Sequence, residues 1–83
     1  MIIDVQLPRG TRVSEGWADL VIRLRTEAGL SRVELAKLTE LDVTYVAKIE
    51  RNGFIPHPRT IQRIARVLGI DIIEALRVTG YLE

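Results

Sequence analysis

Apolar positions along the chain change their spacing near residue 14. Before it, apolar residues at positions 3, 5 and 7 alternate with polar ones, a period of two that predicts a short strand. The sequence Pro8-Arg9-Gly10 then breaks the alternation. Residues 1–13 are therefore interpreted as a separate N-terminal arm or short extended segment, with a poorly ordered tail as the alternative.

From Ser14 onward the spacing becomes helical. Ser14 is the expected N-cap of a first helix, which ends at Ala28-Gly29 through a glycine that can adopt positive φ. Its apolar residues recur at i, i+3, i+4 and i+7, which places them on one face. They are Trp17, Leu20, Val21 and Leu24.

Two short helices joined by a tight corner are predicted next. Ser31 and Glu34 form a capping box for the first, which spans 32–39, and Asp42 caps the second, which ends at Asn52-Gly53. The residues expected to face inward are Leu35, Ala36 and Leu38 in the first, and Val46, Ile49 and, as one of two options, Tyr45 in the second.

Two further helices complete an all-α domain over residues 14–83. Pro58 falls at the N1 position of the fourth helix, and Asp71 caps a fifth over 72–78. The fourth helix has one apolar face, formed by Ile61, Ile64, Ala65 and Leu68, and ends at Gly69. Five helices in under 70 residues, with short connections, predict a compact helical fold.

Composition narrows the function classes. Eighty-three residues make one small domain, and the absence of cysteine excludes a disulfide framework or thiolate metal site. The single histidine, His57, lies between prolines, and the serines are better explained as caps, so we expect no catalytic residue, metal or cofactor. With no signal peptide and no run of ~18 apolar residues, we expect a soluble cytoplasmic protein that does not enter a membrane.

Charge is unevenly distributed although the net charge is only +1. Residues 17–50 hold six acidic and five basic residues, whereas 51–69 hold four arginines and no acid. Arginine suits phosphate recognition, so this segment is a candidate for contact with nucleic acid. A solvated helix face is the alternative.

The two short helices over 32–52 have the spacing of a helix-turn-helix. A small Ala36 allows close approach, and Leu35, Leu41, Val46 and Ile49 lie between the two helices. This arrangement leaves the outer face of the second helix free to enter a DNA major groove.

Residues 17–70 resemble the repressor/Cro-type helix-turn-helix family, also called the xenobiotic-response-element type. The resemblance rests on LRTEAGLSRVELAKLTELDVTYVAKIERNG and TIQRIARVLGI, read together with Pro56. It implies a five-helix, lambda-repressor-like domain that binds double-stranded DNA, usually as a homodimer on a two-fold symmetric operator. The implied function is a prokaryotic or phage transcriptional regulator, a repressor, that is associated with the nucleoid when bound.

The family pattern assigns Arg25 and Glu50 to a structural ion pair. The sequence departs from the pattern in three places. Arg32 stands where a phosphate-binding glutamine is common, and Glu40 stands where the corner is usually glycine. A left-handed non-glycine residue costs about 1 kcal/mol. The recognition helix opens with Val43 and Thr44 instead of the amides or guanidinium that make bidentate base contacts.

The expected DNA contacts divide into two sets. The base-reading set on the outer face of the recognition helix is Val43, Thr44, Tyr45, Ala47 and Lys48. The phosphate-binding set is Ser31, Arg32, Arg51, Asn52, Gly53, Arg59 and Thr60. Val43 and Ala47 can only pack on thymine methyls, and Thr44 offers one hydroxyl. Lys48 is the best long donor for guanine, with a solvated surface lysine as the alternative. The side chain of Tyr45 is expected either to reach DNA or to pack into the core.

The C-terminal apolar residues exceed what one short helix can bury, which suggests a homodimer interface, with closure of the domain's own core as the alternative. They are Ile70, Ile72, Ile73, Leu76, Tyr81 and Leu82. Two alternatives to a free-standing regulator stay open. One is the antitoxin of a toxin–antitoxin pair, which would bind a toxin and regulate its own operon. The other is a protein-interaction module that has lost DNA binding.

Overall fold

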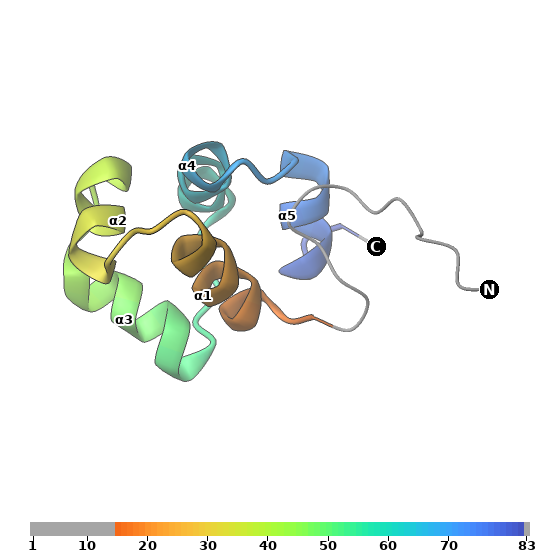
Figure 1. The fold of residues 1–83 in the computed structure, drawn as a ribbon. Helices are drawn as coiled ribbons and strands as arrows, with labels where there is room; N and C mark the ends of the chain where they lie inside the picture. The colour runs from red at the N-terminus through yellow and green to blue at the C-terminus, as the bar shows by residue number, and fades with distance from the viewer. Residues whose placement is uncertain (1–14, 83) are drawn as a thin grey trace.

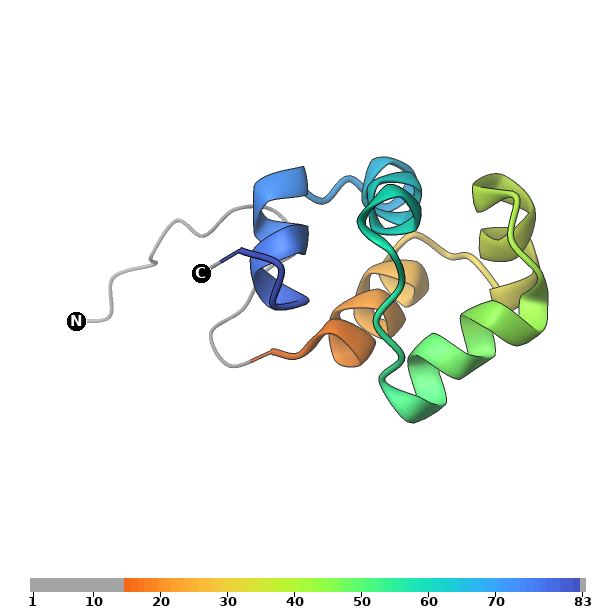
Figure 2. The same ribbon diagram turned by 180° about the vertical axis from the view of Figure 1, so that it is seen from behind.

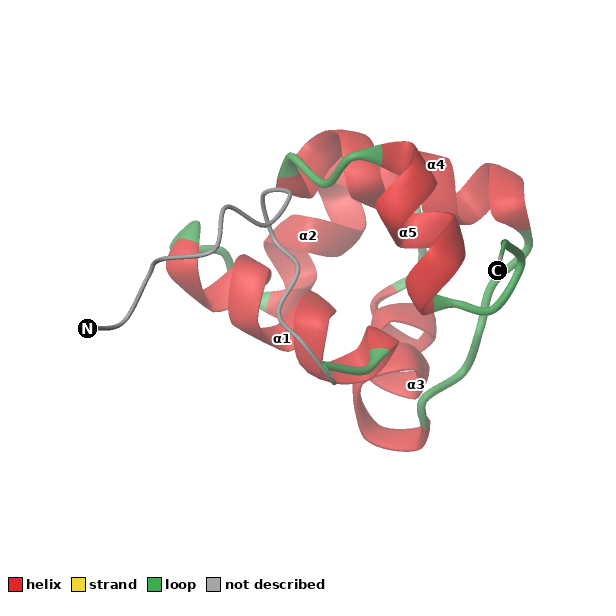
Figure 3. Cartoon of the chain, turned by 90° about the vertical axis from the view of Figure 1, so that its right-hand side faces the viewer, coloured by secondary structure: helices red, strands yellow, loops and turns green. Residues whose placement is uncertain are grey.

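The computed structural model describes residues 15–82, which form five helices with short connections (Figure 1). They are α1 (Trp17–Glu27), α2 (Arg32–Thr39), α3 (Val43–Asn52), α4 (Pro58–Leu68) and α5 (Ile72–Val78). Within this part of the chain there is no strand, so the predicted all-α class is confirmed (Figure 3). The predicted arm over residues 1–13 lies outside the described residues.

Most helix ends follow from local cap chemistry. The Ser31 hydroxyl accepts a hydrogen bond from the Glu34 amide at 3.0 Å, and the Glu34 carboxylate accepts one from the Ser31 amide at 2.7 Å, which completes the predicted capping box. Asp42 caps α3 as predicted, and Pro58 opens α4. The expected N-cap at Ser14 is wrong. Helix α1 begins at Trp17, and its N-cap is Gly16, which makes no side-chain cap hydrogen bond.

The core gathers apolar side chains from all five helices around α1. Trp17, Leu20, Val21 and Leu24 are all buried, as their spacing predicted. The remaining buried apolar residues are Leu35, Ala36, Val46, Ile49, Pro56, Ile61, Ile64, Ala65, Leu68, Ile70 and Ala75. Each helix therefore contributes part of its surface to one shared interior.

In α2, the inner face differs from the prediction at one position. Leu38 is 57% exposed, whereas the adjacent Thr39 is 1% exposed. A step of one residue turns a helix by about 100°, and Thr39 shares the face of Leu35 four residues earlier. The buried hydroxyl of Thr39 is satisfied because it donates to the Leu35 carbonyl at 2.7 Å.

Helices α2 and α3 form one end of the molecule and α5 the other, with α1 and α4 between them (Figures 1 and 2). Helix α3 packs against both α2 and α1. None of the described helices is long and apolar enough to cross a membrane.

Candidate nucleic-acid interface

Helix α3 presents an outer face at one end of the molecule. Its first turn is fixed by Asp42, whose Oδ1 accepts hydrogen bonds from the Thr44 amide at 2.8 Å and from the Thr44 hydroxyl at 2.6 Å. Val43, Thr44 and Lys48 are exposed, and Ala47 is half-buried. The hydroxyl expected to read a base is thus already bonded to the cap carboxylate in the free protein. These bonds lower the pKa of Asp42 below its ordinary value, the side-chain bond from Thr44 having the larger effect.

The surface over this face is a shallow depression. It is lined by Asp42, Thr44, Tyr45, Ala47, Lys48, Arg51 and Asn52. Four of the five residues predicted to read bases therefore share one concave surface with two of the residues predicted to bind phosphate. The fifth base-reading candidate, Val43, is exposed beside them at the start of α3.

Near its C-terminal end, the inner face of α3 has a buried carboxylate that is held by two guanidinium groups. The side chain of Glu50 is fully buried. Arg25 donates to it through Nε at 2.7 Å and Nη2 at 3.0 Å, which forms the ion pair implied by the family resemblance. Arg32 donates a third bond, from Nε to Oε1 at 2.7 Å. Arg25 also donates to the carbonyl of Leu30 at 2.9 Å, so the cluster joins α1, α2 and α3.

The protonation of this cluster follows from competing effects. Burial raises the pKa of Glu50, but the hydrogen bonds and charges of Arg25 and Arg32 together outweigh it, so the pKa lies below its ordinary value of 4.5. The Glu50 carboxylate in turn raises the pKa of Arg25. One carboxylate faces two guanidinium groups, so Arg25, Arg32 and Glu50 together carry one net positive charge, while the first turn of α2 also holds the Glu34 carboxylate.

Aromatic contacts hold the central part of the outer face. Tyr45 is half-buried, with its ring packed edge-on against Phe54 at 5.4 Å between centroids and an interplanar angle of 84°. Lys48 Nζ lies 4.5 Å from the centroid of the same ring. The sequence reasoning did not single out Phe54. The one signal in the sequence that could have indicated its role is the position of Phe54 directly after Gly53, the glycine that ends α3.

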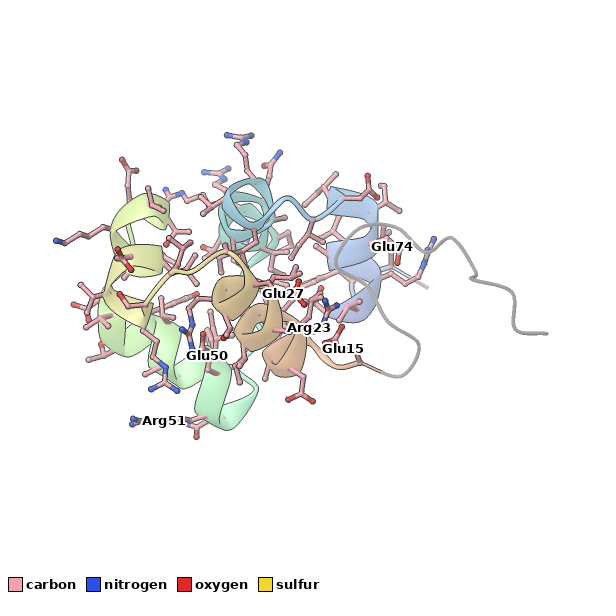
Figure 4. The ribbon with its side chains drawn as sticks, in the orientation of Figure 1. Glu15, Arg23, Glu27, Glu50, Arg51 and Glu74 are labelled. Atoms are coloured by element: carbon pink, nitrogen blue, oxygen red, sulfur yellow. The ribbon has the colours of Figure 1, made fainter. Side chains whose placement is uncertain are left out.

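The candidate phosphate-binding residues occupy three places. Ser31 and Arg32 lie at the start of α2, and Arg51, Asn52 and Gly53 lie exposed at the end of α3, where Figure 4 shows Arg51 pointing away from the domain and Glu50 toward α1. Arg59 and Thr60 lie in the first turn of α4. Figure 2 shows the segment after Gly53 running back across the molecule to that helix.

The corner between α2 and α3 has a left-handed residue. Glu40 has φ 60° and ψ 37° and ends α2 as its C-cap. Among the described residues it is the one non-glycine with positive φ, a conformation that favours glycine. The turn geometry expected for a helix-turn-helix is therefore kept even though glutamate occupies the corner.

Two short helices set at such a corner, with the second exposed along its outer face, define the helix-turn-helix class of domain. The chain belongs to the helix-turn-helix family of Cro/C1 type, whose model matches residues 21–74. A curated relative is the ImmF control region 10 kDa protein of Bacillus phage phi105, 33% identical over 48 residues. That match covers 58% of this chain and 53% of the relative, so the chain matches about half of the relative's length.

Solved structures resemble the domain as well. The restriction-modification controller protein C.AhdI from Aeromonas hydrophila is 34% identical, with a TM-score of 0.65, covering 71% of this chain and 89% of that one. The N-terminal DNA-binding domain of SinR from Bacillus subtilis is 27% identical, with a TM-score of 0.65 and coverage of 71% and 87%. A structure of SinR in complex with DNA matches with the same identity and TM-score, and covers 71% and 95%.

Proposed function

We propose that this protein is a DNA-binding transcriptional regulator of prokaryotic or phage type that inserts α3 into the major groove. The observation that carries the proposal is the division of α3 into two faces. Glu50 and the apolar residues of the inner face fix the helix to α1 and α2, while the outer face stays open as a shallow depression lined by hydrogen-bonding and cationic side chains. The relatives described as controller or DNA-bound proteins support the same assignment.

The outer face supports limited hydrogen-bonded base reading. Val43 and Ala47 offer apolar surface suited to thymine methyls, and Lys48 offers one long donor. Tyr45 is packed on Phe54 but still lines the depression, so its hydroxyl is proposed as a contact at the rim. A repressor with these side chains depends on DNA shape and on the spacing of half-sites for part of its selectivity.

Phosphate contacts are proposed for the cations and amides flanking α3. Arg32 is held at Nε by Glu50, and this bond is compatible with its remaining N–H groups donating to a phosphate beside the amides at the start of α2. Arg51 and the side-chain amide of Asn52 are proposed to do the same at the C-terminal end of α3. The backbone N–H of Gly53 is less suited to this role, because it already donates to the Ile49 carbonyl at 3.0 Å. Such contacts orient the protein without specifying sequence.

We propose that the protein binds DNA without catalysing a reaction. Its proposed location is the cytoplasm, where it is associated with the nucleoid when bound to DNA. Two side chains that could act as nucleophile or base are used as helix caps instead. Ser31 takes part in the capping box, and His57 accepts a hydrogen bond at Nδ1 from the Arg59 amide at 3.1 Å.

A homodimer formed through the C-terminal region is proposed as the binding form. Ile73, Tyr81 and Leu82 are exposed, with Ile72 and Leu76 half-buried beside them. Ile70 does not belong to this surface, because it is 6% exposed and packs in the domain's own core. Light scattering tests the proposal: Ile73→Asp should convert a dimer to a monomer, and a wild-type protein that is monomeric at high concentration would contradict it.

DNA binding itself is tested with a duplex selected from a random pool. Affinity should fall by about 10³-fold or more between 50 and 200 mM salt if six or more phosphates are contacted, because counterions are released. Arg51→Ala should weaken binding to all sequences and reduce the logarithmic salt slope by about 0.9 for each protomer bound, or about 1.8 for the dimer. Lys48→Ala should change which sequence is preferred, whereas the matched control Lys37→Ala on α2 should not. A protein-interaction module would select no duplex and show little binding at any salt concentration.

A further inference from the structure

Phe54 contacts two side chains of the outer face of α3 from outside that helix. It follows Gly53, whose left-handed backbone, φ 69° and ψ 24°, ends α3 and turns the chain. The half-buried ring then lies back along the helix, with the Tyr45 ring 5.4 Å away and Lys48 Nζ at 4.5 Å. One aromatic side chain therefore touches residues in two successive turns.

The electrostatics of both contacts are favourable. An aromatic ring is negative on its faces and positive at its edge, so aromatic pairs prefer the edge-to-face arrangement seen between Tyr45 and Phe54. A lysine ammonium over the ring centroid is attracted by the same charge distribution. A saturated side chain of similar size could fill the space but would not hold the ammonium in this way.

We propose that Phe54 is a positioning residue that sets sequence preference by holding Tyr45 and Lys48 in place before DNA arrives. The inference rests on the proposed function, since both side chains line the depression over α3. A free lysine side chain samples many rotamers, and ordering it on binding opposes association. If the Phe54 ring already holds the Lys48 side chain in the free protein, less conformational entropy is lost when DNA binds. The benefit applies only to a base edge that the ammonium reaches from this position, so the contact favours some sequences over others.

The free protein offers a test that needs no DNA. The chain has one phenylalanine and two lysines, so Lys37 serves as the internal control for Lys48. In Phe54→Leu, the NMR signals of the Lys48 ε-methylene should lose their upfield ring-current shift, while those of Lys37 stay unchanged. Phe54→Tyr, which keeps the aromatic face, should retain the shift.

The DNA test compares preferred and scrambled duplexes in competition. Phe54→Leu should lower the preference for the selected site by roughly two- to fivefold for each protomer bound, the size expected of one partly exposed cation–π contact. Binding to the scrambled duplex and the salt slope should be unchanged, because no phosphate contact is removed. Phe54→Tyr should restore the preference.

The outcomes separate this inference from the proposed function. If the wild-type protein selects no duplex, the proposed function fails, whatever the ring-current shifts are. If the wild type is selective and Phe54→Leu is equally selective, the positioning role is overturned. A loss of preference in both the Leu and the Tyr variants, with both still folded by circular dichroism, also overturns it, since the aromatic face would then not be the cause.

Discussion

The inner face of α3 is closed by the rest of the domain, whereas its outer face is open along its length. On the inner face, Val46 and Ile49 are buried, and Glu50 forms hydrogen bonds with arginines from two other helices. On the outer face, Lys48 and Arg51 are exposed, and Lys48 Nζ lies over the ring of Phe54 in the next loop. A change on the inner face should therefore alter stability, and a change on the outer face should alter binding.

The largest expected effect comes from removing the buried carboxylate. Glu50→Ala leaves Arg25 and Arg32 without their shared partner, and the free energy of unfolding should fall by about 3–5 kcal/mol. Urea denaturation measures it. The adjacent outer-face substitution Arg51→Ala is the control and should stay within about 0.5 kcal/mol of wild type. Equal losses in the two variants would remove the distinction between the faces.

Acid should weaken the same cluster. Because the pKa of Glu50 is lowered in the folded state, its contribution to stability is complete above the ordinary value of 4.5 and is lost as pH falls through the lower folded pKa. The stability difference between wild type and Glu50→Gln should thus be full at pH 7. Below pH 4.5 it should shrink by up to about 1.4 kcal/mol per pH unit. A difference that is the same at acid and neutral pH would contradict the charge-pair account.

Asp42 lies where the two faces meet, at the N-terminus of α3. Asp42→Ala should cost about 1 kcal/mol, because the Thr44 amide loses its cap. Asp42→Asn keeps a good cap and should cost much less, while removing a negative charge from the depression proposed to face DNA. Its affinity for any duplex should therefore rise. Thermal denaturation and duplex titration test the pair, and a weaker-binding Asn variant would argue against DNA at this face.

The smallest predicted effect is at the corner. Glu40→Gly removes the strain of a left-handed residue, roughly 1–2 kcal/mol, but makes the unfolded chain more flexible by about 0.4–1 kcal/mol. A net gain of about 0.5 kcal/mol in the free energy of unfolding is expected. Substituting another exposed α2 residue, Lys37→Gly, should destabilise instead, since the backbone there is helical. Destabilisation by Glu40→Gly would mean that the glutamate side chain itself supports the corner.

Helix positions were predictable because their signals are local. The bounds of α2 and α5 match the prediction, since Ser31 with Glu34 and Asp71 with its following turn act within four residues of each cap. The inner face of α3 was equally clear from the spacing of Val46 and Ile49. Leu38 was expected to face inward and Ile70 to lie at a dimer interface. The apolar pattern alone did not reveal which side chains of a short helix, or of the connection after α4, face the core.

Contacts between residues that are far apart in the sequence were harder to predict. Arg25 and Glu50 were paired through the family resemblance, but the third bond from Arg32 depends on how α2 crosses α3. The contacts of Phe54 depend on the direction of the chain after Gly53, which the sequence pattern does not define. Side-chain geometry at the candidate interface therefore required the folded structure.

The most direct test of the two-face account is an NMR titration of the labelled protein with its selected duplex at low salt. Amide signals of the outer positions of α3, the start of α2 and the Asn52-Gly53 turn should shift, and the shifts should diminish at high salt. The amides of α5 should change little apart from effects of dimerisation. Shifts confined to α5, or none at all, would contradict the assignment of α3 as the DNA-reading helix.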